Sequence, residues 1–143
     1  AAGLASIEKT ELSDLESYAV EEFCAPTLDY SMAVAFANKG AHAMCDISDA
    51  LVIQAEQLAQ ASSVQLVFDS QSFKASEEFA QLSELADVSG ADVWQWIFAG
   101  GEDHVFLATG RDLPGLCVGL VKEGSGVIGL EMKKAPDTWR HFS

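Results

Sequence analysis

Basic residues are scarce in this sequence. Of its 143 residues, 8 are Lys or Arg and 22 are Asp or Glu, which gives a formal net charge of −14. Such a chain has no basic patch that could replace the counterions of a phosphate backbone, so we expect no nucleic-acid partner. No apolar run reaches the roughly 20 residues that a membrane-spanning helix needs, and we expect no membrane partner.

Cysteine is equally scarce, and the usual start of a protein is missing. Cys24, Cys45 and Cys117 are odd in number, widely spaced and without a Cys-x-x-Cys pair. We expect reduced, mostly buried thiols in a cytoplasmic protein. The chain begins with Ala1 instead of Met, and its first residues have neither the basic region nor the apolar segment of a signal peptide. We therefore expect a piece of a longer protein.

The remaining composition is that of a globular domain. Hydrophobic residues make up 49% of the chain and charged residues 21%. The strands and helices alternate but the last two strands are adjacent, which predicts an α/β (α+β) domain with a mixed β-sheet and helices packed on it. The absence of a P-loop and of Gly-x-Gly-x-x-Gly argues against a doubly wound nucleotide-binding fold. Periodicity and capping signals predict helices over 14–24, 31–38, 49–61 and 76–86, a short helix after Asp92, strands over 41–46, 64–68 and 104–109, and a hairpin of 116–122 with 127–130.

The segment from Gly40 to Leu51 is the most informative part of the chain. An apolar strand runs into Asp46, Ser48 and Asp49 and then into a long helix. Strand ends and helix N-termini commonly face a ligand-binding crevice in α/β proteins. One of the three residues could simply cap the helix, but capping does not readily explain all three together. Two adjacent carboxylates repel each other without a cation or proton between them, and a metal–phosphate site would satisfy them.

Two further segments are candidate site elements. Gly100–Asp103 lies between a predicted helix and strand, where paired glycines let the backbone approach a ligand closely and adopt positive φ. An ordinary loop with two solvated acids is the alternative. Trp139 stands in an irregular tail, where an aromatic side chain either docks on the core or lines a ligand pocket.

Three motifs, in this order along the chain, resemble those of the C-terminal domain of thiamine-monophosphate kinase. They are Ala43–Leu51, Gly100–Asp103 and Trp139–Phe142. This family belongs to the superfamily of aminoimidazole ribonucleotide synthetase, whose C-terminal domain has a mixed sheet covered by helices. The resemblance implies that 1–143 is the single C-terminal domain of a two-domain kinase, and that an N-terminal domain with ATP and metal sites lies outside this chain.

The resemblance also implies a reaction and a set of site residues. The reaction is transfer of the γ-phosphate of ATP to thiamine monophosphate, which gives thiamine diphosphate. The resemblance assigns no catalytic residue to this chain. It implies a homodimer of the full-length protein and an inactive isolated fragment. The implied sites are Mg²⁺ ligands at Asp46 and Asp49, a contact with a phosphate of ATP at Ser48, and binding of thiamine monophosphate by Glu102 and Trp139.

Several positions depart from the family pattern. Ala50 replaces a usual Gly, which we expect to restrict the backbone at the junction, and Leu28–Asp29 lacks the usual second Pro and Arg. Thr138 and Arg140 stand where Gly and Asp are usual. The alternatives are another enzyme of the superfamily (aminoimidazole ribonucleotide synthetase, selenophosphate synthetase or the hydrogenase-maturation type) or a divergent non-catalytic domain. The aromatic-x-His-Phe ending favours the kinase.

Overall fold

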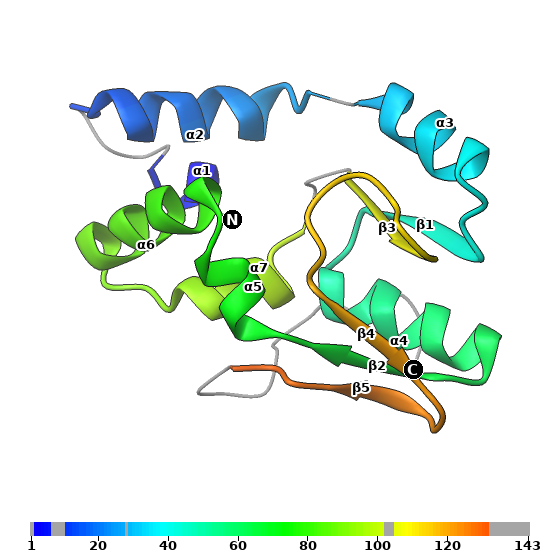
Figure 1. The fold of residues 1–143 in the computed structure, drawn as a ribbon. Helices are drawn as coiled ribbons and strands as arrows, with labels where there is room; N and C mark the ends of the chain where they lie inside the picture. The colour runs from blue at the N-terminus through cyan, green and yellow to red at the C-terminus, as the bar shows by residue number, and fades with distance from the viewer. Residues whose placement is uncertain (1, 7–10, 28, 102–104, 132–143) are drawn as a thin grey trace.

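The structure, a computed structural model, describes residues 2–6, 11–27, 29–101 and 105–131 (Figure 1). Within these ranges, no helix is long and apolar enough to cross a membrane. The helices are α1 (Ala2–Ser6), α2 (Asp14–Cys24), α3 (Tyr30–Asn38), α4 (Leu51–Ser62), α5 (Ser70–Lys74), α6 (Glu77–Ser89) and α7 (Val93–Ala99). The strands are β1 (Ala43–Ile47), β2 (Gln65–Phe68), β3 (Val105–Thr109), β4 (Gly119–Lys122) and β5 (Gly126–Ile128).

The described strands form two sheets. β1 pairs antiparallel with β3, so that Ala43 lies opposite Thr109 and Ile47 opposite Val105. In the second sheet β2 is the central strand, antiparallel to β4 and parallel to β5. The prediction of a mixed sheet with helices packed on it is therefore confirmed, with the strands divided between two sheets.

The predicted hairpin is wrong, because β2 lies between β4 and β5. The β2 side chains Leu66 and Phe68 are buried, so the backbone N–H and C=O groups of β2 need hydrogen-bond partners on both edges of the strand. Glycines let both neighbours come close. A Cβ on Gly119 would lie 2.2 Å from the carbonyl oxygen of Val67, and one on Gly129 would lie 2.2 Å from that of Phe68.

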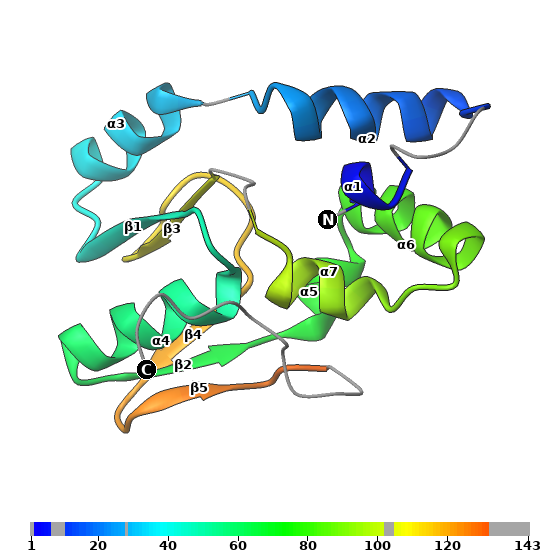
Figure 2. The same ribbon diagram turned by 180° about the vertical axis from the view of Figure 1, so that it is seen from behind.

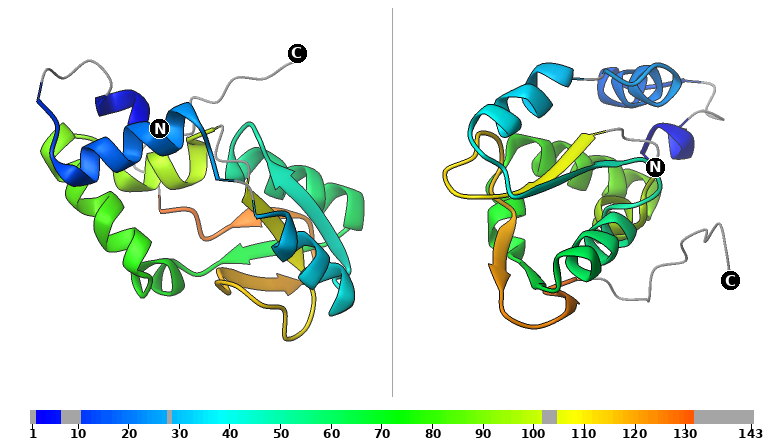
Figure 3. Two further views of the ribbon diagram at one scale, coloured as in Figure 1. Left: turned by 90° about the horizontal axis from the view of Figure 1, so that it is seen from above. Right: turned by 90° about the vertical axis from the view of Figure 1, so that its right-hand side faces the viewer.

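Helix α4 contacts both sheets and joins them into one body (Figure 2). Its buried side chains Leu51, Ala55 and Leu58 belong to the same core cluster as Leu66 and Phe68 of β2. Helix α3 lies beside β3, whereas α1, α2 and α6 contact one another at the opposite end of the molecule (Figure 3). Helix α4, which follows β1 along the chain, therefore links the β1–β3 pair to the second sheet.

An aromatic cluster fixes α7 against the second sheet. Phe98 is fully buried, and its ring centroid lies 5.4 Å from that of Phe68, 5.5 Å from that of Phe73 and 5.7 Å from that of Trp94. Aromatic pairs at these separations add roughly 0.5–1.5 kcal/mol each beyond the burial of their area. The end of α7, where the chain enters Gly100, is thus anchored in the core.

Local capping signals account for the helix that matched its prediction best. The capping box of α2 is present: the backbone N–H and the hydroxyl of Ser13 both donate to Glu16 Oε2 at 2.9 Å. Two short helices, α1 and α5, were not predicted. Asp69 caps α5 by accepting from the backbone N–H of Gln71 at 3.1 Å.

The cysteines are free thiols, as predicted, but they are not mostly buried. Cys24 and Cys117 are exposed, and Cys45 is half-buried on β1. Burial, and to a lesser degree the negative charge of Asp46, raise the pKa of the Cys45 thiol. This thiol therefore stays protonated near neutral pH, which makes it a poor nucleophile.

Candidate functional site

Asp46 projects from the open face of the β1–β3 pair. Neighbouring residues of a strand point to opposite faces, and the next residue, Ile47, is buried in the core. Asp46 is exposed and lies opposite Phe106 of β3, with the exposed Met44 on the same face. Its carboxylate is therefore available to a ligand at this face.

Ser48 and Asp49 are half-buried in the bend between β1 and α4. Helix α4 begins at Leu51, two residues after the predicted start, and its N-cap position is Ala50. The N-cap position therefore belongs to none of the three polar residues, which weakens the simple capping explanation for them. Ala50 has φ −165° and ψ 146°, an extended conformation open to any L-residue. The expected restriction of the backbone by alanine is therefore wrong.

Gln54, which sequence reasoning missed, binds the backbone N–H of the N-cap residue at this junction. Its side-chain Oε1 accepts from the backbone N–H of Ala50 at 3.0 Å, and its Nε2 donates to Asp49 Oδ2 at 3.4 Å. The residue is only 6% exposed. The sequence did contain a signal for this role. Ala50, at the N-cap position, has no polar side chain, and one helical turn later Gln54 places an amide on the apolar face of the helix.

Gly101 brings the second motif into contact with the first. Helix α7 ends at Gly100, whose N–H donates to the carbonyl oxygen of Trp96 at 3.0 Å. A Cβ on Gly101 would lie 2.2 Å from the carbonyl oxygen of Asp49, so only glycine permits this approach. This close approach is made to the backbone of the junction, and the close approach to a ligand stays a prediction. Neither glycine has positive φ, so that part of the prediction is wrong.

Two predicted site residues lie outside the described residues. They are Glu102, in the second motif, and Trp139, in the third. The structure therefore locates Asp46, Ser48 and Asp49 and the glycine that contacts the last of them.

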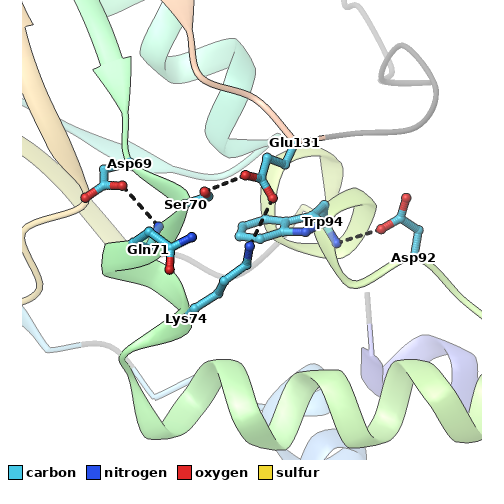
Figure 4. A network of polar contacts seen from close by, with 7 residues as sticks. All are labelled: Asp69, Ser70, Gln71, Lys74, Asp92, Trp94 and Glu131. Atoms are coloured by element: carbon cyan, nitrogen blue, oxygen red, sulfur yellow. Dashed lines mark hydrogen bonds and ion pairs between the residues drawn. The ribbon is translucent and has the colours of Figure 1, made fainter.

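The final described residue, Glu131, is joined to α5 (Figure 4). Its carboxylate accepts from the Ser70 hydroxyl at 2.5 Å and from Lys74 Nζ at 3.3 Å. The Ser70 hydrogen bond, and then the contacts with Lys74, lower the pKa of Glu131. Lys74 Nζ also lies 5.5 Å from the ring centroid of Trp94. The chain before the third motif is thus fixed to α5, and Lys74 of that helix in turn contacts Trp94 of α7.

The donor set at the junction suits part of a magnesium site. Across the described ranges there is no cluster of three or more His, Cys, Asp or Glu residues that could hold a metal ion. Mg²⁺, however, is usually bound through one or two carboxylates together with phosphate oxygens and waters. Asp46 and Asp49 are two carboxylates of the kind that such a site uses.

A cavity among the described residues reaches Ile47 and Leu51, the apolar residues on either side of this junction. It measures about 1280 Å³ and is bounded by β1, β2, β3, β4 and the β3–β4 connection. Its lining is largely apolar and includes Phe36, Leu66 and Leu107 but not Asp46, Ser48 or Asp49. We therefore place the candidate site at the junction, where Asp46, Ser48 and Asp49 lie.

Comparison with known proteins identifies the relationship. No family model matches the chain. A thiamine-monophosphate kinase from Corynebacterium glutamicum is 42% identical over 90 residues, which are 63% of this chain and 26% of the relative. The kinase from Aquifex aeolicus is 34% identical over 144 aligned positions, covering 95% of this chain and 45% of the relative. This chain is a relative of thiamine-monophosphate kinase.

A solved structure extends the relationship to the fold. AaThiL, complexed with AMPPCP and TMP, matches with a TM-score of 0.79 and 28% sequence identity. The match covers 99% of this chain and 48% of that one. The resemblance to thiamine-monophosphate kinase and the predicted fold class are therefore confirmed. The chain spans less than half the length of the relatives it matches.

Proposed function

We propose that this chain is the C-terminal domain of a thiamine-monophosphate kinase, which transfers the γ-phosphate of ATP to thiamine monophosphate and forms thiamine diphosphate. The relatives carry that name, and the structural neighbour is complexed with TMP and with AMPPCP, an analogue of ATP. The observation in this chain that carries the proposal is the contact of Gly101 with the Asp49 carbonyl, because it joins two of the family's motifs at one place.

At the junction, Asp46 and Asp49 would hold Mg²⁺, and the Ser48 hydroxyl would donate to a phosphate oxygen of ATP. A bound magnesium ion neutralises phosphate charge as the phosphoryl group is transferred. The residues of this chain supply the orientation. Asp49 is held at a fixed place by its neighbours, and Asp46 faces outward from the end of a paired strand. Such positioning is the main contribution of a protein to phosphoryl transfer.

Thiamine monophosphate would be bound by Glu102 and by Trp139, the latter stacking on the pyrimidine ring. Other partners follow from the same proposal. An N-terminal domain of the same protein would supply the remaining metal ligands and most nucleotide contacts, and the full-length protein would be a homodimer. The three free thiols favour a cytoplasmic location.

The proposal is tested by comparing this chain with the longer protein that includes its N-terminal domain. With ATP and Mg²⁺, the longer protein should convert thiamine monophosphate to thiamine diphosphate. The 143-residue chain alone should form no product, because half of the metal and nucleotide ligands would be missing. Chromatography of the thiamine phosphates measures both. Turnover by the short chain would contradict the domain assignment, and a folded longer protein without turnover would contradict the function.

The Trp139→Ala variant should bind thiamine monophosphate more weakly. Loss of stacking worth roughly 0.5–1.5 kcal/mol should raise the KM for thiamine monophosphate by about tenfold or less, with little change in the KM for ATP. Trp139→Phe keeps a stacking ring and is the matched control. If Trp139 is only a core anchor, the melting temperature will fall and both KM values will change alike.

A further inference from the structure

We propose that Gln54 is a positioning residue for Asp49, and that it orients the Asp49 carboxylate toward the metal ion. The position of its side chain carries the inference. Gln54 is 6% exposed, and both ends of its amide are used: Oε1 by the Ala50 N–H at 3.0 Å and Nε2 by Asp49 Oδ2 at 3.4 Å. This role rests on the proposed function of Asp49.

The chemistry of the partners fixes the orientation of the amide. A backbone N–H can only donate, and an ionised carboxylate can only accept. The carbonyl oxygen of Gln54 must therefore face Ala50, and its NH₂ group must face Asp49. A flipped amide would place donor against donor and acceptor against acceptor, so the arrangement has one orientation.

A single side chain thereby couples the start of α4 to the carboxylate. An ordinary N-cap residue would supply its own side-chain oxygen, but Ala50 has none and makes no side-chain cap. Gln54 reaches back from the buried face of α4 and accepts from the N–H of Ala50 itself. On the other side, Gly101 packs against the Asp49 carbonyl. Asp49 is held from both sides, so its carboxylate loses less freedom when it binds a metal ion.

Two variants separate this role from helix capping. Gln54→Met keeps the length of the side chain and removes both hydrogen bonds. Adding Ala50→Ser to that variant gives α4 a hydroxyl cap and leaves the Asp49 carboxylate without its amide partner. Gln57→Met, on the exposed side of the same helix, is the matched control. All are made in the longer protein that contains the N-terminal domain.

Binding of Mn²⁺ in the presence of AMPPCP, followed by the electron paramagnetic resonance signal of the free ion, is the first readout. Partners that orient a metal ligand usually contribute 10–100-fold to metal affinity, so Gln54→Met should weaken Mn²⁺ binding about that much. The KM for thiamine monophosphate should change less than twofold. The added Ala50→Ser should recover melting temperature but not Mn²⁺ affinity, and Gln57→Met should leave both unchanged.

The outcomes distinguish this role from the proposed function. If Mn²⁺ affinity is unchanged in Gln54→Met, or returns with the melting temperature in the double variant, Gln54 acts only as a cap and the positioning role is overturned. If Gln54→Met does not fold, the double variant gives the answer. If the unmodified protein turns over thiamine monophosphate and its Mn²⁺ binding does not depend on Asp49, the positioning role fails alone. Absence of turnover in the unmodified protein overturns the proposed function as well.

Discussion

Replacing Asp49 with alanine should lower the rate of thiamine diphosphate formation by about 100-fold or more and leave the protein folded. Residues that merely orient metal ligands contribute roughly 10–100-fold, and loss of a ligand itself should cost at least as much. The fold should survive because Asp49 lies half-buried in a bend and its neighbours Leu51 and Ile47 hold the junction in the core. The measurement is kcat at saturating substrates, beside a melting curve.

Two controls make the result specific. Asp87→Ala removes an exposed carboxylate from α6 and should leave the rate unchanged, which excludes a general effect of net charge. Asp49→Asn keeps the size of the side chain and its oxygen for Gln54 but removes the charge, so it should be nearly as slow as the alanine variant. Near-normal turnover in both Asp49 variants would mean that the carboxylate only supports the local structure.

The sequence predicted well the helices whose capping residues lie next to them in the chain. The helix over Asp14–Cys24 carries its capping box in consecutive residues, and the short helix after Asp92 has an N-cap that accepts from the Trp94 N–H. Helix α5 was missed because five residues are too few to show a helical period. The predicted hairpin was wrong because both of its strands pair with β2, which is distant in the sequence, and not with each other. The sequence of the two segments alone does not reveal this choice of partner.

In the candidate site, too, the sequence predicted what neighbouring residues determine and missed what depends on the packing of distant elements. The sequence predicted that Asp46, Ser48 and Asp49 lie at one strand-to-helix junction, and they do. It did not reveal that Gly101 touches the backbone of that junction, because this contact depends on the burial of α7 through Phe98. A pair of glycines in a loop indicates that something must come close. Only the packing of distant elements identifies the neighbour as the Asp49 carbonyl.

That contact leads to the second large expected effect. Gly101→Ala should destabilise the protein and also slow the reaction, because a Cβ placed 2.2 Å from the Asp49 carbonyl oxygen overlaps a backbone atom. Overpacking of this kind costs about 1–3 kcal/mol. To relieve it, the junction or the end of α7 must move. A displacement of about 1 Å in a reactive geometry can reduce the rate roughly 100-fold, so we expect a loss of that order in kcat.

Gly119→Ala provides a control with the same clash at another place. Its Cβ would also lie 2.2 Å from a backbone oxygen, that of Val67, but within the β2–β4 ladder. This variant should lose a similar amount of stability while the folded fraction keeps its kcat. Unfolding in urea and kcat per folded molecule, measured for both variants, separate the two effects. Equal kcat in the two variants would show that Gly101 serves only packing. A loss of kcat in Gly101→Ala alone would link the position of Asp49 to the reaction, because the two substitutions place a Cβ against different backbone segments.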